Sequence, residues 1–237
     1  MANIYLIRHG QASFMSQNYD QLSKLGKTQA TQLGLFLSQQ FPHFQKTWVG
    51  KLVRHDETFQ EVNKVYQNQQ IPFPNNTAYS ELFNEHQATE IFDEVRNDLL
   101  AQNPQLAALY DQKGGKDAEV RAGFLKLFFQ TLHRWAKGEI TSSKFENFDA
   151  FKQRCQQALA LLQEDAQQNE SIIVFSSGGT ICMLMGIVLG IDENTIIDLN
   201  WQTRNTGITQ LHFARNKFFV RSFNEVPHLS TPMITYV

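Results

Sequence analysis

Asn3-Ile4-Tyr5-Leu6-Ile7-Arg8-His9-Gly10 is the stretch of sequence that decides the fold. Its apolar run predicts a buried strand, and in α/β sheets ligands bind just beyond the carboxyl ends of the strands. Arg8 and His9 follow the apolar run, so we expect them at that edge. A guanidinium matches phosphate oxygens, a neutral imidazole is nucleophilic, and a glycine lets the backbone approach an anion closely. The stretch therefore favours phosphoryl chemistry at His9, with Arg8 and Gly10 at the phosphate.

Strand and helix patterns alternate along the rest of the chain. Apolar runs at 47–50 and 172–175 predict further buried strands, each flanked by amphipathic helical patterns. Near the C-terminal end, apolar runs at 208–213 and 218–223 flank a short polar turn and predict a hairpin. The sequence thus predicts an α/β fold with three layers (α/β/α) and a mostly parallel sheet that carries an antiparallel edge strand.

A helical pattern without an intervening strand occupies residues 86–146. It begins directly after Glu85 and lies between sheet strands, so we expect a helical cap inserted into a single domain of residues 1–237. The regularly spaced Phe and Leu residues of this block are expected to form ordinary core.

Length and composition limit the classes of function. A chain of 237 residues with 42% hydrophobic content is long enough for one sizeable core. A net charge of -2 offers no basic field for nucleic acid or for an anionic membrane, which favours a small anionic substrate. No apolar run approaches the ~20 residues of a spanning helix and no signal peptide is visible, so we expect a soluble cytoplasmic protein. Cys155 and Cys182 have no metal-ligand spacing and are predicted to be core thiols.

Several motifs together resemble the histidine phosphatase superfamily, also called phosphoglycerate-mutase-like, over most of the chain. Besides the tripeptide at 8–10, the segment 22–30 resembles the opening of the family's first helix. Leu52, Arg54 and Thr58 resemble the exit from its second strand. The segment 82–86 resembles the one that carries the family's acidic proton donor, and the residues around His228 resemble a closing element.

The resemblance implies a phosphomonoester hydrolase that works through a phosphohistidine at His9. Arg8, Gly10 and Arg54 would bind the phosphoryl oxygens, and Glu85 would protonate the leaving alkoxide. Glu57, Glu81 and Glu90 lie nearby in the sequence, so the sequence leaves open which carboxylate is the acid. Two arginines would supply the positive charge that a metal ion supplies elsewhere, so we expect an acid-type phosphatase with neither metal nor cofactor. A mutase is less expected, because a mutase must protect its phosphohistidine from water.

The chain departs from this family at the second catalytic histidine. The turn that normally reads serine-histidine-glycine-glycine reads Ser176-Ser177-Gly178-Gly179. Ser177 and Gly178 are still expected to contact phosphate, but a hydroxyl carries no positive charge, so low activity is expected. His86 and His228 are candidates for a compensating imidazole, whereas His55 is expected to be a surface residue at the start of a helix.

Two functions therefore stay open. The first is a phosphatase that tolerates the serine, which is favoured because the nucleophile and both arginines are retained. The second is a phosphate-binding relative that has lost turnover and acts as a sensor or binding module. Both require a small phosphomonoester as partner rather than a nucleic acid or a membrane, and the sequence leaves the substrate and the oligomeric state undetermined.

Overall fold

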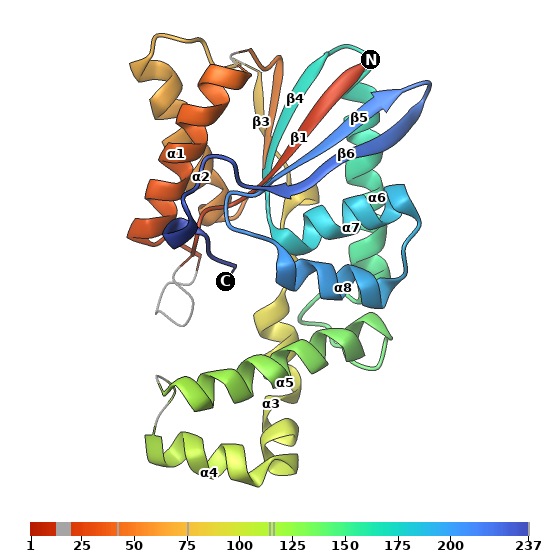
Figure 1. Cartoon of the computed structure of the whole chain (residues 1–237). Helices are drawn as coiled ribbons and strands as arrows, with labels where there is room; N and C mark the ends of the chain where they lie inside the picture. Colours follow the sequence, from red (N-terminus) through yellow and green to blue (C-terminus); the bar gives the residue numbers. More distant parts are fainter. Residues whose placement is uncertain (13–19, 42, 75, 114, 116, 237) are drawn as a thin grey trace. The chain divides into compact units, whose positions relative to one another are not determined.

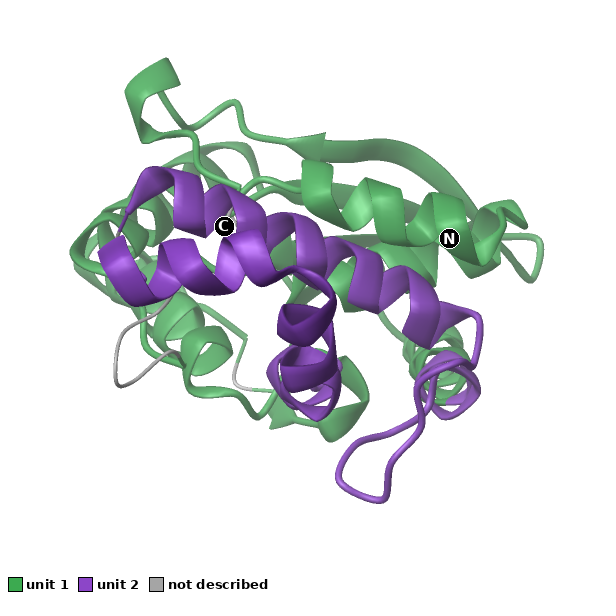
Figure 2. Cartoon of the chain, turned by 90° about the horizontal axis from the view of Figure 1, so that it is seen from below, with its two compact units in different colours: residues 1–85, 154–237 green, residues 86–153 purple. Residues whose placement is uncertain are grey.

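The computed structural model describes residues 1–12, 20–41, 43–74, 76–113, 115 and 117–236. The chain divides into two compact units, one of residues 1–85 and 154–237 and the other of residues 86–153 (Figure 2). The second unit contains the segment predicted to be an inserted cap. That this segment covers the site remains a prediction.

Among the described residues of the first unit, six strands form a central sheet (Figure 1). In the spatial order β3-β2-β4-β1-β5-β6, neighbouring strands among the first four are parallel, whereas β5 is antiparallel to β1 and β6 is antiparallel to β5. The predicted sheet, mostly parallel with an antiparallel hairpin at its edge, is confirmed. The strands are β1 (Ala2–Arg8), β2 (Lys46–Val49), β3 (Thr77–Tyr79), β4 (Ser171–Ser176), β5 (Ile208–Ala214) and β6 (Lys217–Glu225).

Helices cover both faces of this sheet, which confirms the three-layer arrangement (Figure 1). On one face lie α1 (Lys24–Gln40) and α2 (Val53–Asn68). On the other lie α7 (Gly178–Leu189) and the part of α6 (Phe148–Asp165) that belongs to the first unit, with α8 (Glu193–Gln202) beside α7. Side chains alternate along a strand, so alternate strand residues pack under α1 and α2. This core includes Tyr5, Ile7, Leu33, Val49, Phe59, Val62, Ile173 and Phe175.

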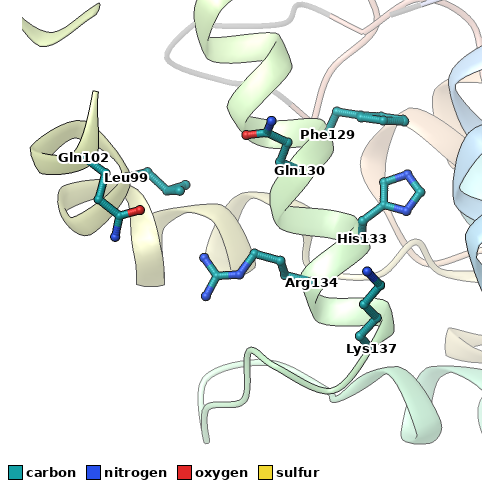
Figure 3. Close-up of a pocket in the computed structure, with 7 residues that line it drawn as sticks. All are labelled: Leu99, Gln102, Phe129, Gln130, His133, Arg134 and Lys137. Atoms are coloured by element: carbon teal, nitrogen blue, oxygen red, sulfur yellow. The ribbon is translucent and has the colours of Figure 1, made fainter. Parts of the chain in front are cut away.

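The second unit is helical in its described residues. It contains α3 (Ala88–Gln102), α4 (Pro104–Lys113), α5 (Ala118–Ala136) and the first residues of α6. Phe92, Leu99 and Leu127 form one of its apolar clusters. A pocket of about 530 Å³ lies between α3 and α5 (Figure 3) and contains none of the predicted site residues; it is lined by Leu99, Gln102, Phe129, Gln130, His133, Arg134 and Lys137.

The cysteines and the lengths of the helices are the subject of two further predictions. Cys155 and Cys182 are buried free thiols, as predicted. Every helix in the described part of the chain is too short or too polar to cross a bilayer.

Two glycines bring the loop after β1 close to the start of α1. A Cβ atom on Gly10 would lie 2.5 Å from the carbonyl oxygen of Gly26, and one on Gly26 would lie 2.1 Å from the carbonyl oxygen of Gln11. The Gln11 N–H also donates to Oε1 of the buried Gln29 at 2.8 Å. Backbone therefore packs directly on backbone here, which is possible only without side chains.

We expect Gly26→Ala to lower the free energy of unfolding by about 1–3 kcal/mol, because the added methyl group meets backbone that has no room to move. Chemical denaturation measures this change. Thr28→Ala is the matched control, since it introduces the same residue at an exposed position of the same helix. Equal denaturation midpoints for the two variants would contradict the close contact.

Candidate active site

The site forms where the carboxyl ends of β1, β2 and β4 meet. The strand register pairs Arg8 with Ser176, and Val49 with Phe175. Beyond these pairs, the N–H of His9 donates to the Ser176 carbonyl at 2.9 Å and the N–H of Gly50 donates to the Phe175 carbonyl at 2.9 Å. The residues that follow the three strands therefore lie together at one edge of the sheet, as the sequence predicts.

The His9 ring is buried and its orientation is fixed. Its Nδ1 atom lies 2.7 Å from the carbonyl oxygen of Gly10. Because a carbonyl only accepts hydrogen bonds, Nδ1 carries the hydrogen and Nε2 keeps its lone pair. The His9 carbonyl in turn accepts hydrogen bonds from the Thr206 N–H at 3.1 Å and from Nδ2 of Asn205 at 3.3 Å. His9 thus has a fixed ring with a nucleophilic Nε2.

The surroundings of His9 keep its imidazole neutral. Burial lowers its pKa well below 6.5, and the positive charges of Arg54 and Arg8 and the neighbouring His55 lower the pKa further. A neutral imidazole is the form that attacks phosphorus. The same two guanidinium groups make the site favourable for an anion.

Both arginines are held in place by neighbouring oxygens. Nη1 of Arg54 forms an ion pair with Oδ1 of Asp20 at 2.7 Å, and Oδ2 of Asp20 accepts a hydrogen bond from the Val53 N–H at 2.9 Å. Nη1 of Arg8 donates to the carbonyl oxygens of Thr203 and Tyr236. Sequence reasoning missed Asp20, because this ion pair joins residues that are distant along the chain.

Thr58 connects α2 to the loop that carries His9. Its hydroxyl accepts a hydrogen bond from the Gly10 N–H at 3.0 Å and donates to the Arg54 carbonyl at 2.7 Å. A shift of α2 would therefore move both the Arg54 guanidinium and the loop that carries His9.

Glu85 lies at the first turn of α7. Its Oε2 accepts a hydrogen bond from the Gly179 N–H at 2.9 Å, where the positive end of the helix dipole attracts a carboxylate. The preceding backbone is fixed as well. Ser176 Oγ donates to the Phe83 carbonyl at 2.7 Å, and Thr180 Oγ1 donates to the Asn84 carbonyl at 2.6 Å. The predicted acid thus binds the backbone of Gly179, two residues after Ser177.

The expectation that His55 lies at the surface is wrong. Its side chain is fully buried, and its Nε2 lies 2.6 Å from Oγ of the equally buried Ser177. Its ring centroid is 5.8 Å from that of His9. A helical signal for this burial exists, because His55 lies four and seven residues before the core side chains Phe59 and Val62 on one face of α2.

The pKa of His55 is also well below 6.5. Burial is the main cause and the charge of Arg54 adds to it, whereas the charge of Glu85 opposes it. His55 therefore has both a cation and a carboxylate for neighbours.

The two histidines proposed as compensating residues have other contacts. Nε2 of His228 lies 2.9 Å from Oγ1 of Thr206, and burial lowers its pKa to about 4. His86 belongs to the second unit, where it stacks on Trp135 at a centroid distance of 4.9 Å. Among the contacts of the described residues, it is His55 that meets Ser177.

Gly178 makes room for α8 and for Arg8. A Cβ atom there would lie 2.5 Å from Oδ1 of Asn200, 2.6 Å from Oγ1 of Thr203 and 3.3 Å from Nε of Arg8. Its predicted contact with phosphate remains a prediction. Within the described residues, no three His, Cys, Asp or Glu side chains gather as metal ligands.

The chain matches the model of a known family. The family model for the histidine phosphatase superfamily (branch 1) matches residues 86–226, which is more than half of the chain. His9 and Arg54 lie outside the matched range. No curated protein matches the chain.

Solved structures share the fold. A variant of the Entamoeba histolytica phosphoserine phosphatase in complex with phosphoserine has a TM-score of 0.64 and 17% identity, over 97% of this chain and 100% of that one. The mycobacterial glucosyl-3-phosphoglycerate phosphatase with inorganic phosphate has a TM-score of 0.62 and 16% identity, over 97% and 100%. The alpha-ribazole phosphatase of Shigella flexneri has a TM-score of 0.60 and 18% identity, over 94% and 96%. At these identities the likeness concerns the fold.

Below pH 6.5, the ordinary pKa of histidine, we expect the free energy of unfolding to fall as the pH falls, because His9 and His55 bind protons only once the chain unfolds. Each group contributes at most about 1.4 kcal/mol per pH unit. Urea denaturation at a series of pH values between about 7 and 5 measures the slope. His55→Gln should reduce it, and His43→Gln, which removes an exposed imidazole, is the control. An unchanged slope in His55→Gln would contradict the burial of a neutral His55.

Proposed function

Because the chain belongs to the histidine phosphatase superfamily, we propose that it is a phosphomonoester hydrolase that works through a phosphohistidine at His9. Its substrate is a small phosphomonoester, and the composition and charge of the chain favour action in the cytoplasm without a nucleic acid or membrane partner. The observation that carries the proposal is the neutral, buried His9, whose Nδ1–H is held by the Gly10 carbonyl beside two arginines.

In the first step Nε2 of His9 attacks phosphorus in line with the leaving oxygen. A nitrogen–phosphorus bond forms, the phosphorus–oxygen bond to the alcohol breaks, and Glu85 gives its proton to the departing alkoxide. Arg8 and Arg54 interact with the phosphoryl oxygens, whose charge is spread over three atoms at this point, and Gly10 lets the backbone come close to them. Ser177 and the N–H of Gly178 at the start of α7 add donors from the other side.

In the second step water attacks the phosphohistidine. Glu85, now a carboxylate, accepts a proton from the water, the nitrogen–phosphorus bond breaks and orthophosphate leaves. His9 returns to its neutral form and Glu85 to its protonated form, so the cycle closes without a cofactor. The two arginines supply the positive charge, which is why we propose that the reaction requires no metal.

Ser177 makes low activity part of the proposal. We infer that it occupies the position of the family's second catalytic histidine, because it follows β4 and stands at the N-cap position of α7 in a serine-glycine-glycine turn. Loss of one transition-state donor typically costs about 2.7–4 kcal/mol. This cost in free energy would slow the enzyme. If the loss were complete, the protein would be the second candidate, a phosphate-binding relative without turnover.

We expect His9→Ala to abolish hydrolysis of an aryl phosphomonoester, because the attacking nitrogen is removed. Acid-labile incorporation of labelled phosphate should disappear with it. His43→Ala, which removes an exposed histidine, should retain both properties. Undiminished turnover in His9→Ala would mean that another residue is the nucleophile. Phosphate binding by a wild-type protein that neither turns over nor takes up label would favour the inactive relative.

Arg54→Ala should mainly weaken the binding of orthophosphate. A hydrogen bond to a charged group contributes about 1.5–3 kcal/mol, so we expect the dissociation constant to rise on the order of 10- to 100-fold. Isothermal titration calorimetry measures it. Lys64→Ala, which removes an exposed cation near the other end of α2, is the control. If both variants bind phosphate as the wild type does, Arg54 does not contact the ligand.

Hydrolysis should be insensitive to EDTA, because the positive charge of the proposed site comes from side chains. Turnover is measured before and after chelation and again after Mg²⁺ or Zn²⁺ is returned. Loss of activity on chelation that a metal ion restores would overturn the metal-independent mechanism.

A further inference from the structure

The pairing of His55 with Ser177 points beyond the residues assigned so far. We propose that His55 has taken over the work of the second imidazole, and that it acts through Ser177 as a positioning residue that polarises the serine hydroxyl toward the phosphoryl group. This inference rests on the proposed function. It assigns the compensating role to α2 rather than to His86 or His228.

The first support is geometric. His55 Nε2 and Ser177 Oγ are 2.6 Å apart and both side chains are fully buried, so water does not separate them. The His55 ring is also 5.8 Å from the ring of the proposed nucleophile His9. An imidazole therefore does contact the turn before α7, although it comes from α2 and not from the turn itself.

The second support is the space around the ring. A Cβ atom on Gly50 would lie 2.1 Å from Nδ1 of His55, so the ring fits only because residue 50 has no side chain. Ser177 is likewise small enough to leave room on the opposite side of the ring. A histidine at position 177 would have to enter volume that the His55 ring already occupies. The small residues Gly50 and Ser177 thus leave the space that the His55 ring fills.

The third support is the direction of the hydrogen bonds. A serine hydroxyl has one donor and two acceptor positions. If Ser177 donated to His55, its lone pairs would face the phosphoryl oxygens and repel them. A phosphoryl anion therefore favours the opposite arrangement, in which the single hydrogen of the neutral His55 ring lies on Nε2 rather than on Nδ1 beside the Gly50 backbone. His55 Nε2–H then donates to Ser177 Oγ, and the Ser177 hydroxyl donates to the anion. Hydrogen bonds in such a chain strengthen one another.

The charges around the pair suit this role. Arg54 precedes His55 in α2, and the carboxylate of Glu85 lies at the start of α7. The Arg54 cation acts electrostatically on the His55 ring, and Glu85 adds a negative charge once it has given its proton to the leaving group. Charge that moves onto the phosphoryl oxygens during transfer favours the donor arrangement most in the transition state, so the effect should appear in kcat more than in KM.

The experiment is a set of variants assayed with one aryl phosphomonoester. His55→Ala and Ser177→Ala should each lower kcat about 10- to 100-fold with little change in KM, somewhat less than removal of a full oxyanion donor. Because the two residues act as a unit, the double variant should be no slower than either single variant. His55→Gln places an amide N–H near the position of Nε2, and we expect it to recover most of the loss.

The double variant His55→Ala with Ser177→His, the swap variant, tests the inference most directly. It returns an imidazole to the turn and empties the volume that it needs, so its kcat should exceed that of His55→Ala by about tenfold or more. Ser177→His alone should not exceed the wild type, because His55 still fills the space. Thermal unfolding of each variant identifies any that fail to fold. If His55→Ala is one of them, His55→Leu, which fills the same space without an N–H, carries the test with His55→Gln as its matched control, and equal kcat values for these two variants would contradict the role of His55.

Three results would overturn the inference. One is an unchanged kcat in both His55→Ala and His55→Gln. The second is independent, multiplicative losses of kcat in the double alanine variant. The third is a loss of kcat in His86→Ala or His228→Ala as large as the one expected for His55→Ala. Labelling of His9 separates this failure from failure of the proposed function: if the wild type forms no acid-labile phosphoenzyme, the proposed function is wrong, whereas labelled enzyme that is indifferent to His55 refutes only the role of His55.

Discussion

The parallel pairing of β1 with β4, in which Arg8 lies opposite Ser176, is the constraint on which the site depends. A parallel pair ends at the same edge of the sheet, so the loop with His9 and the turn with Ser177 emerge side by side. β2 adds Gly50 and the start of α2 at that edge, because it pairs with β4 in register. A slip of one residue in either ladder would turn His9 or Ser177 to the opposite face of the sheet.

Around this edge, the buried hydrogen bonds and charges together keep His9 neutral and favour the binding of an anion. The carbonyl of Gly10 fixes the tautomer of His9, while burial and two guanidinium groups keep its pKa low. A site that is cationic and desolvated before any ligand arrives is costly in isolation, because buried charges require partners. Asp20 offsets part of that cost for Arg54. An incoming phosphate would offset more, which is why the same features that strain the site suit an anion.

Local patterns predicted the parts of the fold that depend on local chemistry. The apolar run of β1 and the polar turn between β5 and β6 each carry their own signal. In that turn Arg215 and Asn216 both have positive φ, as a tight hairpin requires. His9, Arg54 and Glu85 were identified from motifs, and the structure brings them to one edge.

Features that depend on distant partners were not predictable in the same way. The position of His55 at the start of a helix, next to a charged residue, predicts an exposed side chain, whereas its spacing to Phe59 and Val62 places it on the buried face. Its contact with Ser177 joins residues 122 positions apart, and no local pattern carries such information. Thr206 has a φ of 55°, unusual for a β-branched residue, and its N–H donates to the His9 carbonyl. Such strain is maintained by tertiary contacts alone.

The most direct measurement is a crystal structure of the protein with orthovanadate, which mimics the phosphoryl group in transfer. The central claim predicts His9 Nε2 on one axial side of vanadium, Arg54 at the equatorial oxygens, and an unbroken chain from His55 through the Ser177 hydroxyl to one of those oxygens. Vanadate bound without His9, or an oxyanion contacted by His86 or His228 with Ser177 turned away from it, would contradict that claim.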